Sequence, residues 1–185
     1  MTTTTSPIAP VRPEAAPAPA APAAPASAAR LLAVLRILLG FMLVWDVVDK
    51  VFGLGISTAA AKSWLAGVSP TAGYLASLHG PAGILAPLAG QAWVDWAFMG
   101  GMLLIGAALM LGIGLRAAAA AGTLLFALLW VSAMPTQNNP FVDEHVVFAL
   151  LLWVFATTRA GDTWGFGRPW DALAAQRVAW LRQLG

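Results

Sequence analysis

The sequence predicts an all-α integral membrane protein: a four-helix bundle with a long outer loop between its first and second spans, followed by a C-terminal amphipathic helix. Three observations predict this class. The 185 residues are 59% hydrophobic and only 10% charged, whereas about a quarter of the residues in a soluble domain are charged. Four long apolar segments follow a polar leader. Arginine and lysine fall on opposite sides of those segments. The lipid bilayer is therefore the expected partner, and nucleic acid is not.

Residues 1–30 are rich in Thr, Ala and Pro and contain no aromatic residue, which predicts a disordered leader. This leader is too long and too polar for the usual secretory signal, so we expect the first apolar segment to remain as an uncleaved helix. Cysteine is absent from the chain. Disulfides, thiolate metal sites and iron–sulfur ligation on this polypeptide are thereby excluded.

Four apolar segments are predicted to cross the membrane: 31–53, 94–114, 117–134 and 141–158. The first would be about 34 Å long as a helix, enough for a hydrocarbon core of about 30 Å. The short GLR connection between the second and third predicts an antiparallel hairpin, in which Ala118 and Gly122 suit close helix contact. These segments define a transmembrane domain over 31–158 and a tail over 159–185.

The basic residues predict how the helices are oriented. Both lysines, Lys50 and Lys62, fall on one side of the predicted membrane, and all eight arginines fall on the other. The arginines are Arg12, Arg30, Arg36, Arg116, Arg159, Arg168, Arg177 and Arg182. Because cytoplasmic loops carry the excess of positive charge, we expect both termini to be cytoplasmic. The connections 54–92 and 135–140 then face outward.

Two further segments are predicted outside the spans. Within the outer loop, STAAAKSWLAG (57–67) is expected to form a short amphipathic helix with Trp64 and Leu65 at the lipid boundary. The rest of that loop is either a cap over the bundle or a passive loop on the lipid. In the tail, Gly161 stops the fourth helix and GFGRPW predicts a turn. Residues 171–184 then form a basic amphipathic helix, for an anionic inner leaflet or for a partner subunit.

Ionisable residues near the outer ends of the spans are the candidate site, because such groups are costly in a membrane. Asp46, Asp49 and Lys50 share one face of the first span, where Lys50 can neutralise Asp46 one turn away. The predicted topology brings Asp95 and the sequence Asp143-Glu144-His145 to the same depth. Their convergence predicts either a proton-handling cluster beneath the outer loop or a structural polar network.

The stretch NNPFVDEH (138–145) also contains helix-capping chemistry. Asn138 or Asn139 is expected to cap the fourth helix, with Pro140 in its first turn. Capping does not explain His145, which is expected to be neutral and hydrogen-bonded, or paired with Asp49 or Glu144. The other histidine, His79, lies in the outer loop, and no His-x-x-x-His spacing exists. We therefore expect no haem and no metal.

The order of these features resembles the DoxX family of bacterial four-helix membrane proteins, which includes the DoxD-like subunits of thiosulfate:quinone oxidoreductase. The resemblance covers roughly residues 31–170 and is carried by RILLGFMLVWDVVDKVFG, SPTAGYLASLHGPAG, VDWAFMGGMLLIGAALMLGIGLR, NNPFVDEHVVFALLLWVFA and RAGDTWGFGRPWDAL. It implies a small subunit of the bacterial plasma membrane linked to quinone or sulfur redox chemistry. The motif positions present here are Asp46, Asp49, Lys50, Asn139, Pro140, Asp143 and His145.

Two functional hypotheses follow. In the first, the chain is a quinone-linked oxidoreductase subunit that uses quinone as a diffusible substrate and a partner subunit or a second copy for part of the chemistry. His145 with Asp46 or Asp49 would exchange protons. The quinone or its anionic electron donor would be bound by Lys50, Trp45, Asp143, Glu144, Asn139 and His79. In the alternative, the chain is a non-catalytic scaffold or assembly subunit of a respiratory or oxidative-stress complex.

Overall fold

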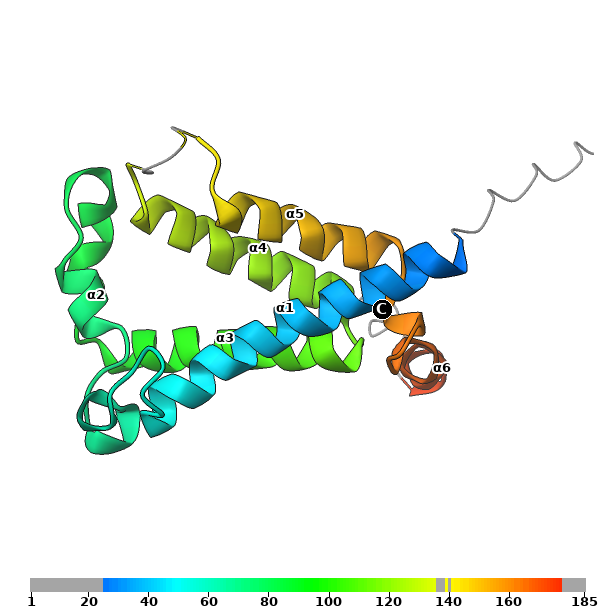
Figure 1. The fold of residues 1–185 in the computed structure, drawn as a ribbon, viewed down its shortest axis with the longest axis horizontal. Helices are drawn as coiled ribbons and strands as arrows, with labels where there is room; N and C mark the ends of the chain where they lie inside the picture. Colours follow the sequence, from blue (N-terminus) through cyan, green and yellow to red (C-terminus); the bar gives the residue numbers. More distant parts are fainter. Residues whose placement is uncertain (1–24, 136–138, 140, 178–185) are drawn as a thin grey trace, which may run out of the picture.

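The computed structural model describes residues 25–135, 139 and 141–177, which form six α-helices, short 3₁₀ helices and turns, with no β-strand among them (Figure 1). The prediction of an all-α protein is confirmed for these residues. The helices are α1 (Ala26–Phe52), α2 (Ala72–Ala76), α3 (Ala92–Leu111), α4 (Leu115–Ser132), α5 (Glu144–Thr157) and α6 (Gly167–Arg177).

Three of these helices, α1, α3 and α4, are long and apolar enough to cross a membrane. Helix α5 has 14 residues and is therefore only about 21 Å long. The outward faces of all four helices are apolar: Leu104 is 73% exposed and Leu150 is 64% exposed, and Leu38 and Leu124 are exposed as well. A surface of this kind is stable against lipid and not against water. The fold thus supports the predicted membrane association.

Helices pack in two pairs, α1 with α3 and α4 with α5, and α3 joins the pairs by packing on α4. The backbones of α1 and α3 approach most closely at Gly40 and Gly106. A Cβ atom on Gly40 would lie 2.7 Å from the Gly106 carbonyl oxygen, a distance that real Cβ atoms do not reach. In the other pair, Ala118 and Gly122 are buried, but Gly122 faces Leu152 of α5 more closely than it faces α3, the partner predicted for it.

The two helix pairs meet at one end and diverge at the other (Figure 1). We call the first the inner end: here α1 begins, α3 ends, α4 begins and α5 ends. Residues 53–91 extend across the opposite, outer end, between the diverging pairs. Every described arginine with a described side chain belongs to an inner-end segment: Arg30, Arg36, Arg116, Arg159 and Arg168. Lys50 and Lys62 belong to the outer end, so the predicted separation of charge matches the chain's geometry.

Helices α3 and α4 begin two residues earlier than predicted, and α1 and α6 begin four or five residues earlier. Helix α1 starts at Ala26 instead of residue 31, because residues 26–30 contain good helix formers and no proline, with Pro25 at the N-cap position. Helix α6 starts at Gly167 instead of residue 171, because Pro169 falls in its first turn, where a missing N–H is tolerated. Residues 1–24 of the leader and 178–185 of the amphipathic segment lie outside the described residues.

The prediction of an amphipathic helix over 57–67 is wrong. This stretch forms two 3₁₀ turns, Ala60–Lys62 and Trp64–Ala66. Ser63 separates them, because its hydroxyl accepts a hydrogen bond from the Ala66 N–H and its backbone is extended. Leu65 is exposed, as expected for the lipid boundary, whereas Trp64 packs its ring on Trp96 of α3 with ring centroids 4.6 Å apart.

Candidate functional site

The predicted outer-end acids do not converge into one cluster. The last turns of α1 belong to one helix pair and the start of α5 belongs to the other, at the end where the pairs diverge (Figure 1). Among the described residues, no hydrogen bond or ion pair joins α1 to residues 141–145. The expected pairing of His145 with Asp49 is therefore absent. Residue counting predicted the end of the helices at which these groups lie, but it does not determine their lateral separation.

Asp49 anchors the turn that follows α1. Its buried carboxylate accepts hydrogen bonds from the Ser57 hydroxyl at 2.7 Å, the Ser57 N–H at 3.1 Å and the Ile56 N–H at 3.3 Å. A buried carboxylate requires partners of this kind. Asp49 thus has a structural role at this position, and its three partners all come from the connection that immediately follows its own helix.

The remaining α1 candidates have other surroundings. The predicted ion pair between Asp46 and Lys50 is absent from the described residues. Lys50 instead lines a cavity of about 300 Å³ that is also bounded by residues of the outer connection. Trp45 is partly exposed and lies beside Phe41, with ring centroids 6.0 Å apart.

Asp95, in the first turn of α3, holds the start of the outer segment. It is buried and accepts hydrogen bonds from the Ser69 hydroxyl at 2.8 Å and the Thr71 hydroxyl at 2.5 Å. The outer segment also reaches the second helix pair, because the Tyr74 hydroxyl lies 2.8 Å from the Ser132 hydroxyl at the end of α4. Contacts with both pairs favour the cap over the passive loop. We call residues 68–91 the cap.

We expect Asp95→Ala to loosen the cap, because the buried Thr71 hydroxyl and the Ser69 hydroxyl would lose their acceptor. An unsatisfied buried donor costs about 1–3 kcal/mol. Amide hydrogen exchange over residues 69–76 should accelerate by about tenfold, the equivalent of about 1.4 kcal/mol in local opening. Asp46→Ala is the matched control, since Asp46 makes no hydrogen bond or ion pair among the described residues. Equal exchange in both variants would contradict this role.

The start of α5 is built differently from the prediction. Asp143, not an asparagine, is the N-cap, and its carboxylate accepts hydrogen bonds from the His145 and Val146 N–H groups. Asn139 instead forms a turn, with its side-chain oxygen accepting from the Phe141 and Val142 N–H groups. Because Asn139 makes this turn, the helix begins only after Asp143. Asn138 and Pro140 lie outside the described residues.

His145 forms a pair with the capping aspartate. Its Nδ1 atom lies 2.8 Å from Asp143 Oδ2, and the two side chains are 20% and 12% exposed. The imidazole ring faces the core residue Phe126 of α4, with ring centroids 6.2 Å apart. Asp143 therefore uses one oxygen to cap the helix and the other to orient the histidine. The hydrogen bond to Asp143 explains why a histidine stands at position 145, which helix capping alone did not explain.

The other predicted residues are peripheral to this pair. Glu144 is exposed, and His79 is exposed at the start of the 3₁₀ helix Gly80–Leu88. Within the described parts of the chain, Asp143, Glu144 and His145 form the one group with metal-ligating atoms close together, within 4.8 Å of one another. Asp143 and His145 already bind each other and the helix start. The absence of a metal stays a prediction.

A second polar site, at the inner end, is centred on Arg36. This side chain is completely buried and donates hydrogen bonds to the Leu109 and Met110 carbonyl oxygens at the end of α3. It also donates to the Thr163 and Trp164 carbonyl oxygens in the turn after α5, at 3.3 and 3.1 Å. The guanidinium thus occupies the negative end of the α3 dipole and ties α1 to two connections that are distant in sequence.

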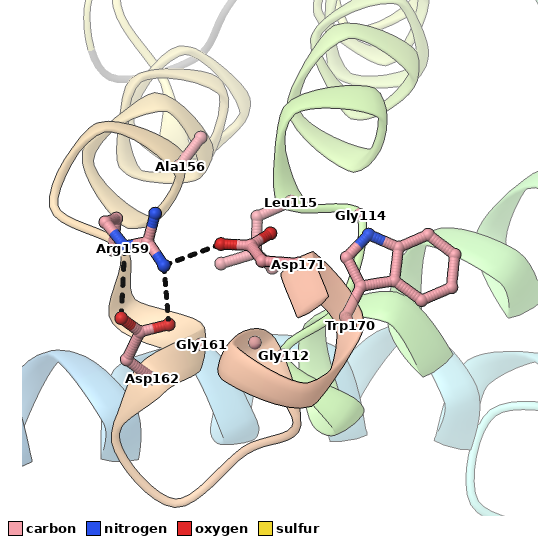
Figure 2. A pocket seen from close by; sticks show the side chains of 10 residues that line it. Gly112, Gly114, Leu115, Ala156, Arg159, Gly161, Asp162, Trp170 and Asp171 are labelled. Carbon is pink, nitrogen blue, oxygen red and sulfur yellow. Dashed lines mark hydrogen bonds and ion pairs between the residues drawn. The ribbon is translucent and has the colours of Figure 1, made fainter. Parts of the chain in front are cut away.

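Glycines allow these connections to touch. A Cβ atom on Gly161 would meet the Gly112 carbonyl oxygen, and one on Gly112 would lie 2.9 Å from Arg36 Nη1. Figure 2 shows the adjoining ion pairs, in which Arg159 donates to Asp162 at 3.0 Å and to Asp171 of α6 at 2.6 Å. These two carboxylates raise the pKa of Arg159. The cavity between these groups is about 20 Å³, room for about one water molecule and not for a substrate.

Arg36 was predicted to be a flanking charge, and this junction was not predicted. Two signals pointed to it. Arg36 is an arginine inside a long apolar segment, where such a group must face protein, and Gly161, Gly165 and Gly167 recur at short intervals after α5. The junction positions helices, and its cavity has no room for a substrate, so the candidate for chemistry is the His145–Asp143 pair.

The fold and its two polar ends define an all-helical, membrane-associated protein with a histidine–aspartate pair at one end of its apolar helices. Comparison of the chain with protein-family models, curated proteins and solved structures found no match. The resemblance to the DoxX family therefore stays a prediction, and so does the quinone-linked function that it implies.

Proposed function

We propose that this chain is a DoxX-like subunit of a quinone-linked membrane oxidoreductase, in which His145 exchanges protons with the quinone. The observation that supports this most is the 2.8 Å contact between His145 Nδ1 and Asp143 Oδ2 at the outer end of an apolar helix. In the proposed orientation, the chain lies in the bacterial plasma membrane with both termini in the cytoplasm. The pair then faces the extracytoplasmic side, where a lipid-soluble quinone meets water.

The pair suits proton exchange for a physical reason. A carboxylate that accepts from Nδ1–H fixes the tautomer of the imidazole and leaves Nε2 to exchange protons with a substrate. The same carboxylate stabilises the imidazolium, which the positive end of the α5 dipole otherwise disfavours. Burial of the ring against Phe126 holds its direction. Among the described residues, His145 makes its ring hydrogen bond only with Asp143.

The proposed reaction requires two electrons and two protons for each quinone reduced to quinol. Two thiosulfate anions supply two electrons when their outer sulfur atoms join in tetrathionate, a step that releases no proton. Both protons must therefore come from water, and His145 passes them one at a time. This chain has no cysteine to hold an iron–sulfur cluster, so we place the electron path between donor and quinone on a partner subunit.

A second candidate function, a scaffold or assembly subunit, is favoured by a separate observation. The carboxylates of Asp49 and Asp95 are occupied as acceptors for neighbouring backbone and hydroxyl groups. These two acids fix the outer connection and have no further role. If the His145–Asp143 pair acts in the same way, as a helix cap alone, the outer end is a docking structure.

Quinone extraction and turnover separate the two functions. The protein, with any co-purifying partner, is isolated in mild detergent, extracted for bound quinone and assayed for quinone reduction with thiosulfate or sulfite. We expect His145→Ala to lower turnover by about 100-fold, the usual lower bound for loss of a general acid–base group. Asp143→Asn should lower it less. Ser77→Ala, an exposed hydroxyl in the cap, should leave it unchanged.

Each alternative outcome identifies a different error. A wild-type protein that carries no quinone and has no turnover, yet retains a stable partner, is a scaffold. Wild-type turnover that survives both His145→Ala and Asp143→Asn would place the proton-exchanging group elsewhere. Melting temperatures of the variants must accompany the rates, because Asp143 also caps α5.

A further inference from the structure

A cavity lies at the outer end, between the last turns of α1 and the connection that follows. It has a volume of about 300 Å³, at the lower end of the range of about 300–1,000 Å³ for small-ligand sites. Both lysines of the chain line it, and its other lining residues are mainly small or hydroxyl-bearing: Ser57, Thr58, Val68, Ser69, Pro70, Gly73 and Tyr74.

Three of the hydroxyl donors of this cavity, those of Ser57, Ser69 and Tyr74, are already used. The Ser57 hydroxyl donates to Asp49, and the Ser69 hydroxyl donates to Asp95. Tyr74 must donate to Ser132, because the Ser132 hydroxyl hydrogen is directed to the Leu129 carbonyl oxygen. The ammonium groups of Lys50 and Lys62 make no hydrogen bond or ion pair with any described residue.

The charged groups of the cavity that have no partner among the described residues are its two ammonium groups. The acids beside it, Asp49 and Asp95, are buried and direct their oxygens at hydroxyl and backbone donors. Neither is bound to a lysine. Two ammonium groups facing one cavity repel each other unless an anion lies between them. A phosphate group, with several acceptor oxygens, satisfies both at once.

The surroundings indicate where that phosphate comes from. At the start of α3, at the same outer end, Trp93 and Trp96 are exposed, as expected of side chains at the headgroup level of a bilayer. Ile56 and Leu65, on the two segments that flank Lys62, are exposed as well. A cationic cavity bordered by apolar side chains at this depth matches a lipid, with its phosphate in the cavity and its acyl chains outside.

We propose that this cavity binds the phosphate of an anionic phospholipid, with Lys50 and Lys62 as the hydrogen-bond donors. The bound lipid would connect the end of α1 to the cap and complete the outer end of the molecule. This inference does not depend on quinone chemistry, and it assigns to Lys50 a ligand other than an electron donor.

Lipid retention tests this directly. The full-length protein is reconstituted in nanodiscs of phosphatidylglycerol and phosphatidylcholine, released into detergent, and examined by native mass spectrometry. We expect the wild type to retain one phosphatidylglycerol. Retention should fall by about tenfold in Lys50→Met and by about tenfold in Lys62→Met, each compared with the wild type. Lys50→Arg should restore retention. Arg30→Met, at the inner end, controls for non-specific attraction of anionic lipid.

Three outcomes would overturn the lipid assignment. They are unchanged retention in Lys50→Met and Lys62→Met, equal retention of phosphatidylcholine, and lysine-dependent binding of free inorganic phosphate in detergent without lipid retention. The last result would make the cavity a site for a soluble oxyanion. Quinone reduction measured on the same preparations is a separate readout, so loss of the lipid and loss of turnover are distinguished.

Discussion

Replacing Arg36 by leucine is expected to destabilise the folded protein by at least about 3 kcal/mol, the usual cost of removing one partner from a buried charged network. Leucine fills much of the volume but donates no hydrogen bond. The Leu109 and Met110 carbonyl oxygens at the end of α3, and those of Thr163 and Trp164, would lose their shared donor. Few of these groups would gain water, because Arg36 is completely buried.

Thermal unfolding in detergent, followed by far-ultraviolet circular dichroism, measures this effect. Arg116→Leu is the matched control, because Arg116 is an exposed arginine at the same inner end and its loss should change stability little. Arg36→Lys should be intermediate, since lysine keeps the charge but lacks the planar fork that reaches several acceptors. An Arg36→Leu melting temperature equal to that of Arg116→Leu would show that the junction does not stabilise the fold.

Replacing Gly106 by leucine is expected to separate α1 from α3. A Cβ atom at this position would lie 2.8 Å from the Gly40 carbonyl oxygen and 2.8 Å from Val44 Cγ2. Backbone on the opposite helix cannot move aside as a flexible side chain can, so the helices must shift apart. Overpacking of this kind costs about 1–3 kcal/mol and sometimes more, and at a backbone contact we expect the upper part of that range.

The same helix provides a control with the opposite expected sign. A Cβ atom on Gly101 would meet nothing within 4 Å, so Gly101→Leu adds only helix propensity, about 1 kcal/mol in favour of the helix. We therefore expect Gly106→Leu to lower the melting temperature and Gly101→Leu to leave it unchanged or raise it. A fall of equal size in both variants would mean that leucine is disfavoured in α3 for a reason other than the α1–α3 contact.

The helical class and the approximate positions of the long helices could be predicted because they depend on local sequence. The length of each apolar run and the short GLR connection follow from residues that are adjacent in the chain. Once the runs are located, the positions of arginine and lysine between them indicate the two sides. The α5 start shows the limit of this reasoning. Asn139 and Asp143 are both good caps, and only the turn that Asn139 makes with Phe141 and Val142 decides in favour of Asp143.

The candidate site was predicted in part, for a geometric reason. Counting residues along a helix gives depth, and it correctly brought His145 and Asp49 to the same outer end. It does not give the lateral position of one helix relative to another. The long outer connection lets the helix pairs diverge there (Figure 1), and Asp49 and Asp95 bind donors of that connection. The partner of His145 is Asp143, two residues away at the start of the same helix.

Labelling with a photoreactive quinone analogue tests most directly whether His145 lies at a quinone site. Membranes containing the protein are irradiated with the analogue, and labelled peptides are identified by mass spectrometry, with natural quinone as competitor. We predict label within residues 141–149, displaced by the competitor and reduced in His145→Ala. Label confined to inner-end residues 159–177, or label over 141–149 that His145→Ala leaves unchanged, would contradict a quinone site at this histidine.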